Sequence, residues 1–164
     1  MITNAKYFIE KLDMIKHPEG GYYKESLISN EIINVNNGKK QRRLWTSIYF
    51  LLQTGDVSHF HKLESDEMWY YHGGSSLTIY MIDMEGNLIT KKLGLNIDKG
   101  EDPQVLVPKG FIFGSAMNNE GYALVGCMVS PGFNFEDFKL FSREKLLKLY
   151  PEHSDIIFKL TKED

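Results

Sequence analysis

The central region of the chain, residues 22–129, consists of strand-like runs with no helical segment between them. Short runs of β-branched and aromatic residues alternate there with turn signals, such as Asn-Asn-Gly at 36–38 and Glu-Gly-Asn at 85–87. About nine or ten strands are indicated. Parallel strands need long crossover connections, usually helical, and the pattern shows none. It therefore predicts an all-β fold, either a closed barrel or a double-sheet jelly roll.

Helical patterns flank this region on both sides. Near the N-terminus, after Thr3 or Asn4 as a capping residue, apolar side chains recur at helical spacing at positions 8, 9, 12 and 15. We expect this short helix to end before Pro18. Near the C-terminus, Ser142 and Pro151 can each begin a helix, and we expect these helices to pack outside the barrel.

The chain shows no internal repeat, low-complexity tract or linker. Its 164 residues suit one folding unit. We therefore expect a single domain at 1–164, with a jelly-roll core at about 20–132 and a C-terminal helical segment at about 136–162.

Charge and composition limit the classes of partner. The formal net charge of -3 gives no general attraction to nucleic acid or to an anionic membrane. No apolar run approaches the roughly 18 residues of a membrane helix, and the acid-containing N-terminus is unlike a signal peptide. The sole cysteine, Cys127, lies in an apolar run, which indicates an inert core thiol in a reducing cytoplasm; a nucleophile is the alternative.

The stretch at 55–74 concentrates residues that can carry chemistry, including three of the five histidines. His59 and His61 are two apart, so on a strand they share a face with Cα atoms roughly 6.7 Å apart. On the next expected strand, Glu67, Trp69 and Tyr71 share a face.

Two imidazoles and a carboxylate from neighbouring strands can hold a divalent metal. The predicted ligands are His59, His61 and Glu67, and Fe, Zn, Ni and Mn all remain open. The alternative is that the histidines are structural or bind a substrate. The later turn at 108–110 precedes an apolar strand at 112–115 that brings no further ligand.

These segments resemble the two motifs of the cupin superfamily. The first motif is a glycine, an HxH pair, a glutamate and a closing glycine, matched here by Gly55, His59, His61, Glu67 and Gly73. The second normally ends in a histidine that completes the metal shell, and here it reads Pro108, Gly110 and Phe113. The fourth ligand is therefore missing.

The resemblance extends to one branch, the short RmlC-like cupins of a domain family of unknown function that carry an HPEGG signature. Its segments are matched in order by HPEGGYYKE, TSIYFLL, FHKLESDEMWYY, LVPKGF, YALVGCMVSPGF and FEDF…YPEH. The resemblance implies a jelly-roll barrel (the cupin double-stranded β-helix) with a pocket inside it. It also implies a homodimer with exchanged N-terminal strands.

The function that this resemblance suggests is an epimerase or isomerase acting on a sugar, a nucleotide-sugar-like compound or an organic acid. His61 would be the general base, Tyr71 would return a proton, and Glu67 would orient the imidazole or hold a hydroxyl. Whether the protein is an enzyme at all is left open.

Two other functions remain possible: a metal-dependent oxygenase that uses the three predicted ligands, and a non-catalytic protein that binds a small ligand. Glu19 is expected either to bond backbone amides at its turn or to reach the barrel mouth beside His61. The full set of expected ligand-binding residues is Glu19, Trp45, Tyr49, His59, Trp69 and Phe113.

Overall fold

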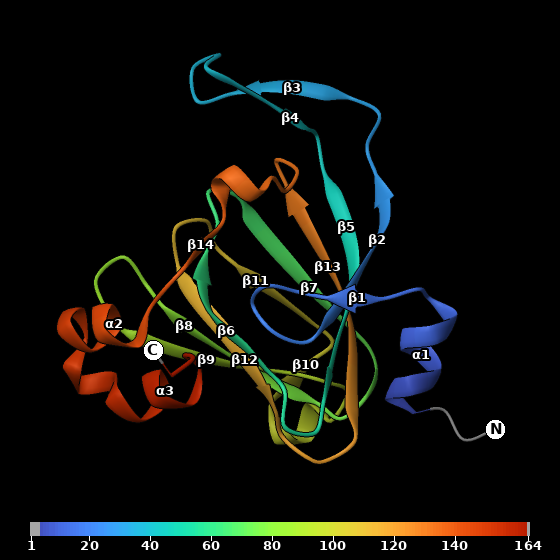
Figure 1. Cartoon of the computed structure of the whole chain (residues 1–164), viewed down its shortest axis with the longest axis vertical. Coiled ribbons are helices and arrows are strands. Elements are labelled where there is room, and N and C mark those ends of the chain that lie inside the picture. The colour runs from blue at the N-terminus through green and yellow to red at the C-terminus, as the bar shows by residue number, and fades with distance from the viewer. Residues whose placement is uncertain (1–3, 164) are drawn as a thin grey trace.

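The computed structural model describes residues 4–163, and the strands of this part of the chain form two six-stranded sheets that face each other (Figure 1). In spatial order, the first sheet contains β1 (Ile15–Lys16), β2 (Tyr22–Ile28), β5 (Thr46–Gln53), β13 (Tyr122–Ser130), β7 (Asp66–Gly74) and β11 (Gln104–Val107). The second contains β10 (Glu101–Asp102), β9 (Leu88–Leu93), β8 (Leu77–Ile82), β12 (Ile112–Met117), β6 (Val57–Lys62) and β14 (Lys139–Leu140). Neighbouring strands are antiparallel except β9 and β10.

A separate hairpin, β3 (Ile32–Val35) and β4 (Lys40–Arg43), projects away from the two sheets at the top of Figure 1. With it, the region from β2 to β13 holds twelve strands rather than the expected nine or ten. The difference comes from elements too short to show a periodic pattern, such as the two-residue β10.

The main core fills the space between the two sheets. Alternate residues of the central strands point inward, and fifteen buried side chains form one cluster that includes Phe50, Trp69 and Val125. Burying a side chain of this size stabilises the fold by about 1.5–3 kcal/mol. Large side chains from both sheets therefore fix the distance between the two sheets. Within this core cluster they leave little empty space.

The N-terminal helix α1 (Ala5–Lys11) is capped by Asn4, whose Oδ1 accepts a hydrogen bond from the Tyr7 amide at 3.0 Å. Thr3, the other predicted cap, lies outside the described residues. The helix was predicted to include Ile15 but ends before it, because the chain turns at Asp13, which has a positive φ of 50°. Ile15 lies in β1 instead, where it pairs with Tyr23 of β2.

The C-terminal segment packs against the outer face of the second sheet, as expected. It contains α2 (Arg143–Leu149), capped by Ser142, and α3 (Ser154–Lys159), which follows the 3₁₀ turns η2 (Phe135–Asp137) and η3 (Pro151–His153) along the chain. Leu146 and Ile157 are fully buried there against Phe60 of β6. A third 3₁₀ turn, η1 (Ile97–Lys99), precedes β10. Across residues 4–163, no helix is both long enough and apolar enough to cross a bilayer.

Candidate active site

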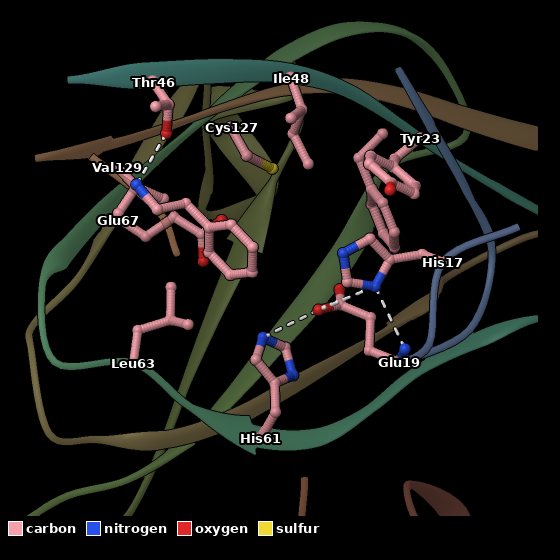
Figure 2. Close-up of a pocket in the computed structure, with 12 residues that line it drawn as sticks. His17, Glu19, Tyr23, Thr46, Ile48, His61, Leu63, Glu67, Cys127 and Val129 are labelled. Atoms are coloured by element: carbon pink, nitrogen blue, oxygen red, sulfur yellow. Dashed lines mark hydrogen bonds and ion pairs between the residues drawn. The ribbon is translucent and has the colours of Figure 1, made fainter. Parts of the chain in front are cut away.

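A pocket lies inside the jelly roll (Figure 2). The empty space between its lining atoms, including the solvent-filled opening, has a volume of about 460 Å³. Its side chains come from the segment before β2, from β2, β5, β6, β7 and β13, and from one residue each after β6 and after β13. The lining residues, which define the barrel pocket, are His17, Glu19, Tyr23, Thr46, Ile48, Phe50, His61, Leu63, Glu67, Cys127, Val129 and Phe133.

A β-bulge in β6 decides which of its side chains enter this pocket. Along β12, Phe113 pairs with His61 and Ser115 pairs with Ser58, so two residues of β6 oppose the single residue Gly114. Ser58 and His61 consequently share the inner face. A side chain at 114 would bring a Cβ within 2.6 Å of the Ser58 carbonyl oxygen, which explains the glycine.

The HPEGG segment lies across the bulge. The Glu19 carbonyl accepts two hydrogen bonds from His59, one from its amide at 2.7 Å and one from its Nδ1 at 2.6 Å. Gly20 permits this crossing, because it has a φ of 111° and any Cβ there would collide with the Val57 carbonyl. The His59 ring, held by these contacts, does not line the pocket, whereas the Glu19 side chain points into it (Figure 2).

Glu19 and His61 form a buried acid–histidine pair. The His61 Nδ1 lies 2.7 Å from the His59 carbonyl oxygen, which can only accept, so Nδ1 carries a proton. The other nitrogen, Nε2, lies 3.1 Å from Glu19 Oε2. A hydrogen bond at this distance requires one proton between the two atoms, held either by the carboxyl or by the imidazole.

Burial decides where that proton rests. Burial raises the pKa of Glu19, against smaller opposing effects of His17 and of a 2.8 Å hydrogen bond from the Ser58 hydroxyl to Oε1. Burial also lowers the pKa of His61 to about 4. Burial therefore favours the carboxylic acid of Glu19 over its carboxylate and the neutral imidazole of His61 over its cation, so the uncharged form of the pair, in which Glu19 donates to His61, is the favoured one.

His17 supports this arrangement from the other side. Its Nδ1 accepts a hydrogen bond from the Glu19 amide at 3.1 Å and lies 3.5 Å from Glu19 Oε2. Burial lowers the pKa of His17, so the ring is neutral and its proton is on Nε2, which faces the cavity in Figure 2.

Glu67 is a second buried carboxyl in the pocket, on β7. The residue is 6% exposed, and its Oε2 makes no hydrogen bond with any residue from 4 to 163. Burial, and after it the charge that Glu19 carries when ionised, raise the pKa of Glu67 to about 8, against a smaller opposing interaction with the Trp69 indole N–H, which itself has no hydrogen-bond partner among residues 4–163. Burial likewise raises the pKa of the neighbouring Cys127 thiol well above its ordinary value, which supports the expected inert thiol.

Aromatic residues after β13 cover the opening of the pocket. The Phe133 ring lines the pocket, and its amide donates to Thr46 Oγ1 at 2.9 Å. The Phe138 ring lies 5.4 Å from the His61 ring. Between these two residues, η2 places Asp137 against the β3–β4 hairpin.

The hairpin holds this cover through an ion-pair cluster. Asp137 accepts two hydrogen bonds from Arg42, at 2.7 and 2.9 Å, and one from Lys40 at 2.8 Å. The hydrogen bonds from Arg42 lower the pKa of Asp137 to about 2. Arg42 and Lys40 of the hairpin therefore hold the segment that contains Phe133 and Phe138.

Of the residues predicted to form the site, the structure brings Glu19, His61 and Glu67 together in the barrel pocket. Glu19 takes the second of its two predicted positions, beside His61. Of the two roles predicted for Glu67, orienting the His61 imidazole is taken by Glu19, and holding a hydroxyl stays a prediction.

Three predicted residues lie on the expected face but outside the pocket lining. Tyr71 shares the face of Glu67, yet it lies four residues, about 13 Å, farther along the strand. Its hydroxyl donates to the Gly74 carbonyl instead of facing a ligand, which corrects its predicted catalytic role. Trp69 is a core residue, and Phe113 packs with its ring centre 4.1 Å from that of His61, behind the pocket wall.

Two further aromatic residues point elsewhere. Ile48 and Phe50 take the inner face of β5, so Tyr49 between them faces outward and lies near His72. Trp45 lies between β4 and β5, where its carbonyl accepts from the Ser29 amide. Neither lines the barrel pocket, so their predicted ligand contacts are not formed.

The predicted three-residue metal site is also not formed. His59 is held by the Glu19 carbonyl, and His61 Nε2 is occupied by the Glu19 carboxyl. Within residues 4–163, no group of three histidine, cysteine or acidic side chains has an arrangement that could hold a metal ion. The donor set therefore does not fit the metal centre that the HxH spacing suggests.

The site includes two residues that were not predicted from the sequence, His17 in the pocket lining and Ser58 bonded to Glu19. His17 stands directly before the signature glycines, so its proximity to Glu19 along the chain was an available signal. Ser58 gave none, because a strand without a bulge would place it on the opposite face from His61.

The fold and the pocket define a jelly-roll barrel of the cupin class with a buried acid–histidine pair. The sequence model described as "Cupin superfamily (DUF985)" matches residues 6–141, and the chain belongs to this family. This confirms the family to which the motifs pointed.

Three relatives cover most of this chain. A protein of known crystal structure from Shewanella oneidensis is 56% identical, with a TM-score of 0.93 over 99% of this chain and 100% of its own. A hypothetical protein from Leishmania major is 37% identical, with a TM-score of 0.91 over 98% and 100% of the two chains. An uncharacterized protein from Saccharomyces cerevisiae is 29% identical over 161 residues, which are 89% of this chain and 79% of that protein.

More distantly, oxalate decarboxylase from Bacillus subtilis matches 91% of this chain with a TM-score of 0.56. The identity is 17%, and the matched part is 37% of that larger chain. This likeness supports the predicted cupin jelly roll and extends to the fold alone.

Proposed function

We propose that the protein is an isomerase that moves a proton on a small carbonyl compound bound in the barrel pocket. The observation that carries the proposal is the buried pair of Glu19 and His61 on one side and the unpartnered Glu67 carboxyl on the other. Two carboxyl groups in different environments are the arrangement by which acid and base roles are divided.

In this proposal Glu67 is the base and Glu19 the acid. The ionised Glu67 takes a proton from the carbon next to the carbonyl, and the C–H electron pair forms the carbon–carbon double bond. The carbonyl oxygen takes the proton from Glu19 Oε2, leaving a carboxylate beside His61. In an α-hydroxy carbonyl compound, the Glu19 carboxylate then takes the proton of the hydroxyl on this carbon while protonated Glu67 returns its proton to the former carbonyl carbon, so the carbonyl group moves by one carbon and both side chains are restored. Since Glu67 has a pKa of about 8, it is a strong base once ionised.

The lining narrows the choice of substrate. Within the described residues 4–163, no lysine or arginine lines the pocket, so a phosphate or carboxylate would meet two carboxyl groups without a counter-ion. This disfavours nucleotide sugars and organic acids among the substrates suggested by sequence. A small carbonyl compound without an anionic group suits the pocket better.

Exchange of carbon-bound hydrogen with solvent tests the proposal. A panel of small hydroxyketones, aldoses and aminoketones is incubated with the protein in deuterium oxide, and NMR follows loss of the proton beside the carbonyl. We expect exchange with wild type, loss of at least about 100-fold in rate with Glu67→Gln, and little change with Glu120→Gln, an exposed turn residue. Ligand binding without any exchange would instead support the non-catalytic binding protein.

We also propose a homodimer with exchanged N-terminal strands and a cytoplasmic location. Exposed apolar side chains on β2 and β3 support the dimer, since Leu27 is 69% and Ile32 is 60% exposed. The single free thiol, Cys127, suits a reducing compartment. Sedimentation at micromolar concentration tests the dimer, and a monomeric mass would contradict it.

A further inference from the structure

The barrel pocket contains two carboxyl groups and, among residues 4–163, no lysine or arginine. The carboxyls belong to Glu19 and Glu67, and each residue is at most 7% exposed. Besides Tyr23, the titratable groups that share the pocket with them are His17, His61 and Cys127. Burial holds both histidines below, and the thiol above, their ordinary pKa values, so all three are neutral near pH 7.

Cationic side chains around the pocket have other partners. Arg42 and Lys40 bind Asp137, Lys162 Nζ donates to the Pro18 carbonyl at 3.4 Å, and none of the three lines the pocket. The barrel pocket therefore has carboxyl groups without a positive partner among the described residues, 4–163.

Glu67 gives independent evidence that a ligand belongs there. Its Oε2 is buried and has no hydrogen-bond partner within residues 4–163, and the Glu67 side chain lines the cavity (Figure 2). An unsatisfied buried carboxyl oxygen costs free energy, which a bound hydrogen-bond donor or positive charge would recover.

The rest of the lining suits an alkylated cation. Three aromatic rings, those of Tyr23, Phe50 and Phe133, line the same cavity, and aromatic faces attract ammonium groups. Aliphatic side chains complete the wall at Ile48 and Leu63. Carboxylate, aromatic ring and aliphatic wall together are the usual surroundings of an amine or a quaternary ammonium in proteins.

We infer that the ligand of the barrel pocket is a small organic cation, an aliphatic ammonium compound whose positive charge lies between Glu19 and Glu67. The inference rests on the proposed function, because it takes the same pocket as the ligand site. It adds to the proposed function that the substrate is positively charged, as an aminoketone or a related amine-bearing carbonyl compound is. The positive charge would keep Glu67 ionised near neutral pH, the form in which it accepts a proton.

A pair of probes with one shape and different charge tests this inference. Choline and 3,3-dimethylbutan-1-ol differ in that a quaternary nitrogen replaces a quaternary carbon. Binding of both to the full-length protein is measured by calorimetry and by NMR line broadening. We expect choline to bind at least about tenfold more tightly than the neutral alcohol.

Two variants test whether the charge of Glu67 causes the preference for choline. Glu67→Gln keeps the size of the side chain and removes its charge, so the preference for choline should fall by about tenfold or more. Glu120→Gln, the same change at an exposed turn, should leave the preference intact. Thermal unfolding of each variant checks that it is folded, and the two-probe comparison on wild type needs no variant.

Three outcomes would overturn the inference: equal or tighter binding of the neutral alcohol, choline binding that Glu67→Gln leaves unchanged, and no binding of choline, trimethylammonium or methylammonium. Each is distinguishable from failure of the proposed isomerase. Hydrogen exchange on a neutral hydroxyketone without cation binding would refute the charge preference and keep the isomerase. Choline binding without hydrogen exchange on any aminoketone would keep the charge preference and refute the isomerase.

Discussion

Replacing Glu67 by glutamine should make the protein more stable at alkaline pH. The carboxyl has a pKa of about 8 in the folded protein against an ordinary value of 4.5. Because the folded-state pKa is raised, the stability associated with the protonated form is fully present below pH 4.5 and is lost as the pH rises toward 8. Between these values each pH unit costs about 1.4 kcal/mol, or about 5 kcal/mol in total.

Glutamine keeps the shape of a protonated glutamate and does not ionise. The free energy of unfolding of Glu67→Gln, relative to wild type, should therefore increase by about 1.4 kcal/mol per pH unit between about pH 5 and pH 8, and then level off. Other titrating groups, such as Glu19 and His61, contribute to both proteins and largely cancel in the difference.

Urea denaturation from pH 5 to 9, followed by circular dichroism at one protein concentration, measures this difference. Glu120→Gln is the matched control. Its free energy of unfolding should depend on pH as that of wild type does, because the side chain is exposed. Parallel curves for wild type and Glu67→Gln would refute the reasoning, since they would mean that the carboxyl is not held in an unfavourable environment.

Three further predictions concern the structure around the pocket. Gly114→Ala should lower the free energy of unfolding by about 2 kcal/mol or more, because the new methyl group would press on the Ser58 carbonyl; an unchanged urea midpoint would contradict the bulge geometry. Asp137→Asn should lower the free energy of unfolding by about 1–3 kcal/mol near neutral pH, because it removes the ion pair with Arg42. Since Arg42 lowers the pKa of Asp137 to about 2, this difference should shrink as the pH falls from 3.8 toward 2, which acid titration of the stability of both proteins would show. Cys127 should react with a thiol reagent at least about 100-fold more slowly in the folded protein than in urea, measured by release of thionitrobenzoate.

The architecture was predictable because its signals are local. Turn residues between alternating apolar runs indicate strands, and the capping residues Asn4 and Ser142 mark where helices begin. Buried strands such as β5 were harder to orient: both of its faces are apolar, so the pattern did not show that Ile48 and Phe50, rather than Tyr49, face inward.

The site was predictable only in part, because it depends on contacts between segments far apart in the chain. The order of residues identified His61 and Glu67 as pocket residues, and they are. It gave the place beside His61 only as one of two expected positions for Glu19, about forty positions before them, since that contact follows from the crossing of the HPEGG segment over β6.

The bulge in β6 also affects how motifs in this protein should be compared with those of other cupins. A motif such as HxH counts positions along the chain, whereas a metal or a ligand responds to directions in space. With two residues of β6 opposite one of β12, the spatial neighbour of His61 on the inner face is Ser58, three positions earlier. An alignment that matches His59 to a metal-binding histidine would therefore equate side chains that point in different directions. Deleting one residue of the bulge, rather than substituting a ligand, would be the first step in building a metal site on this strand.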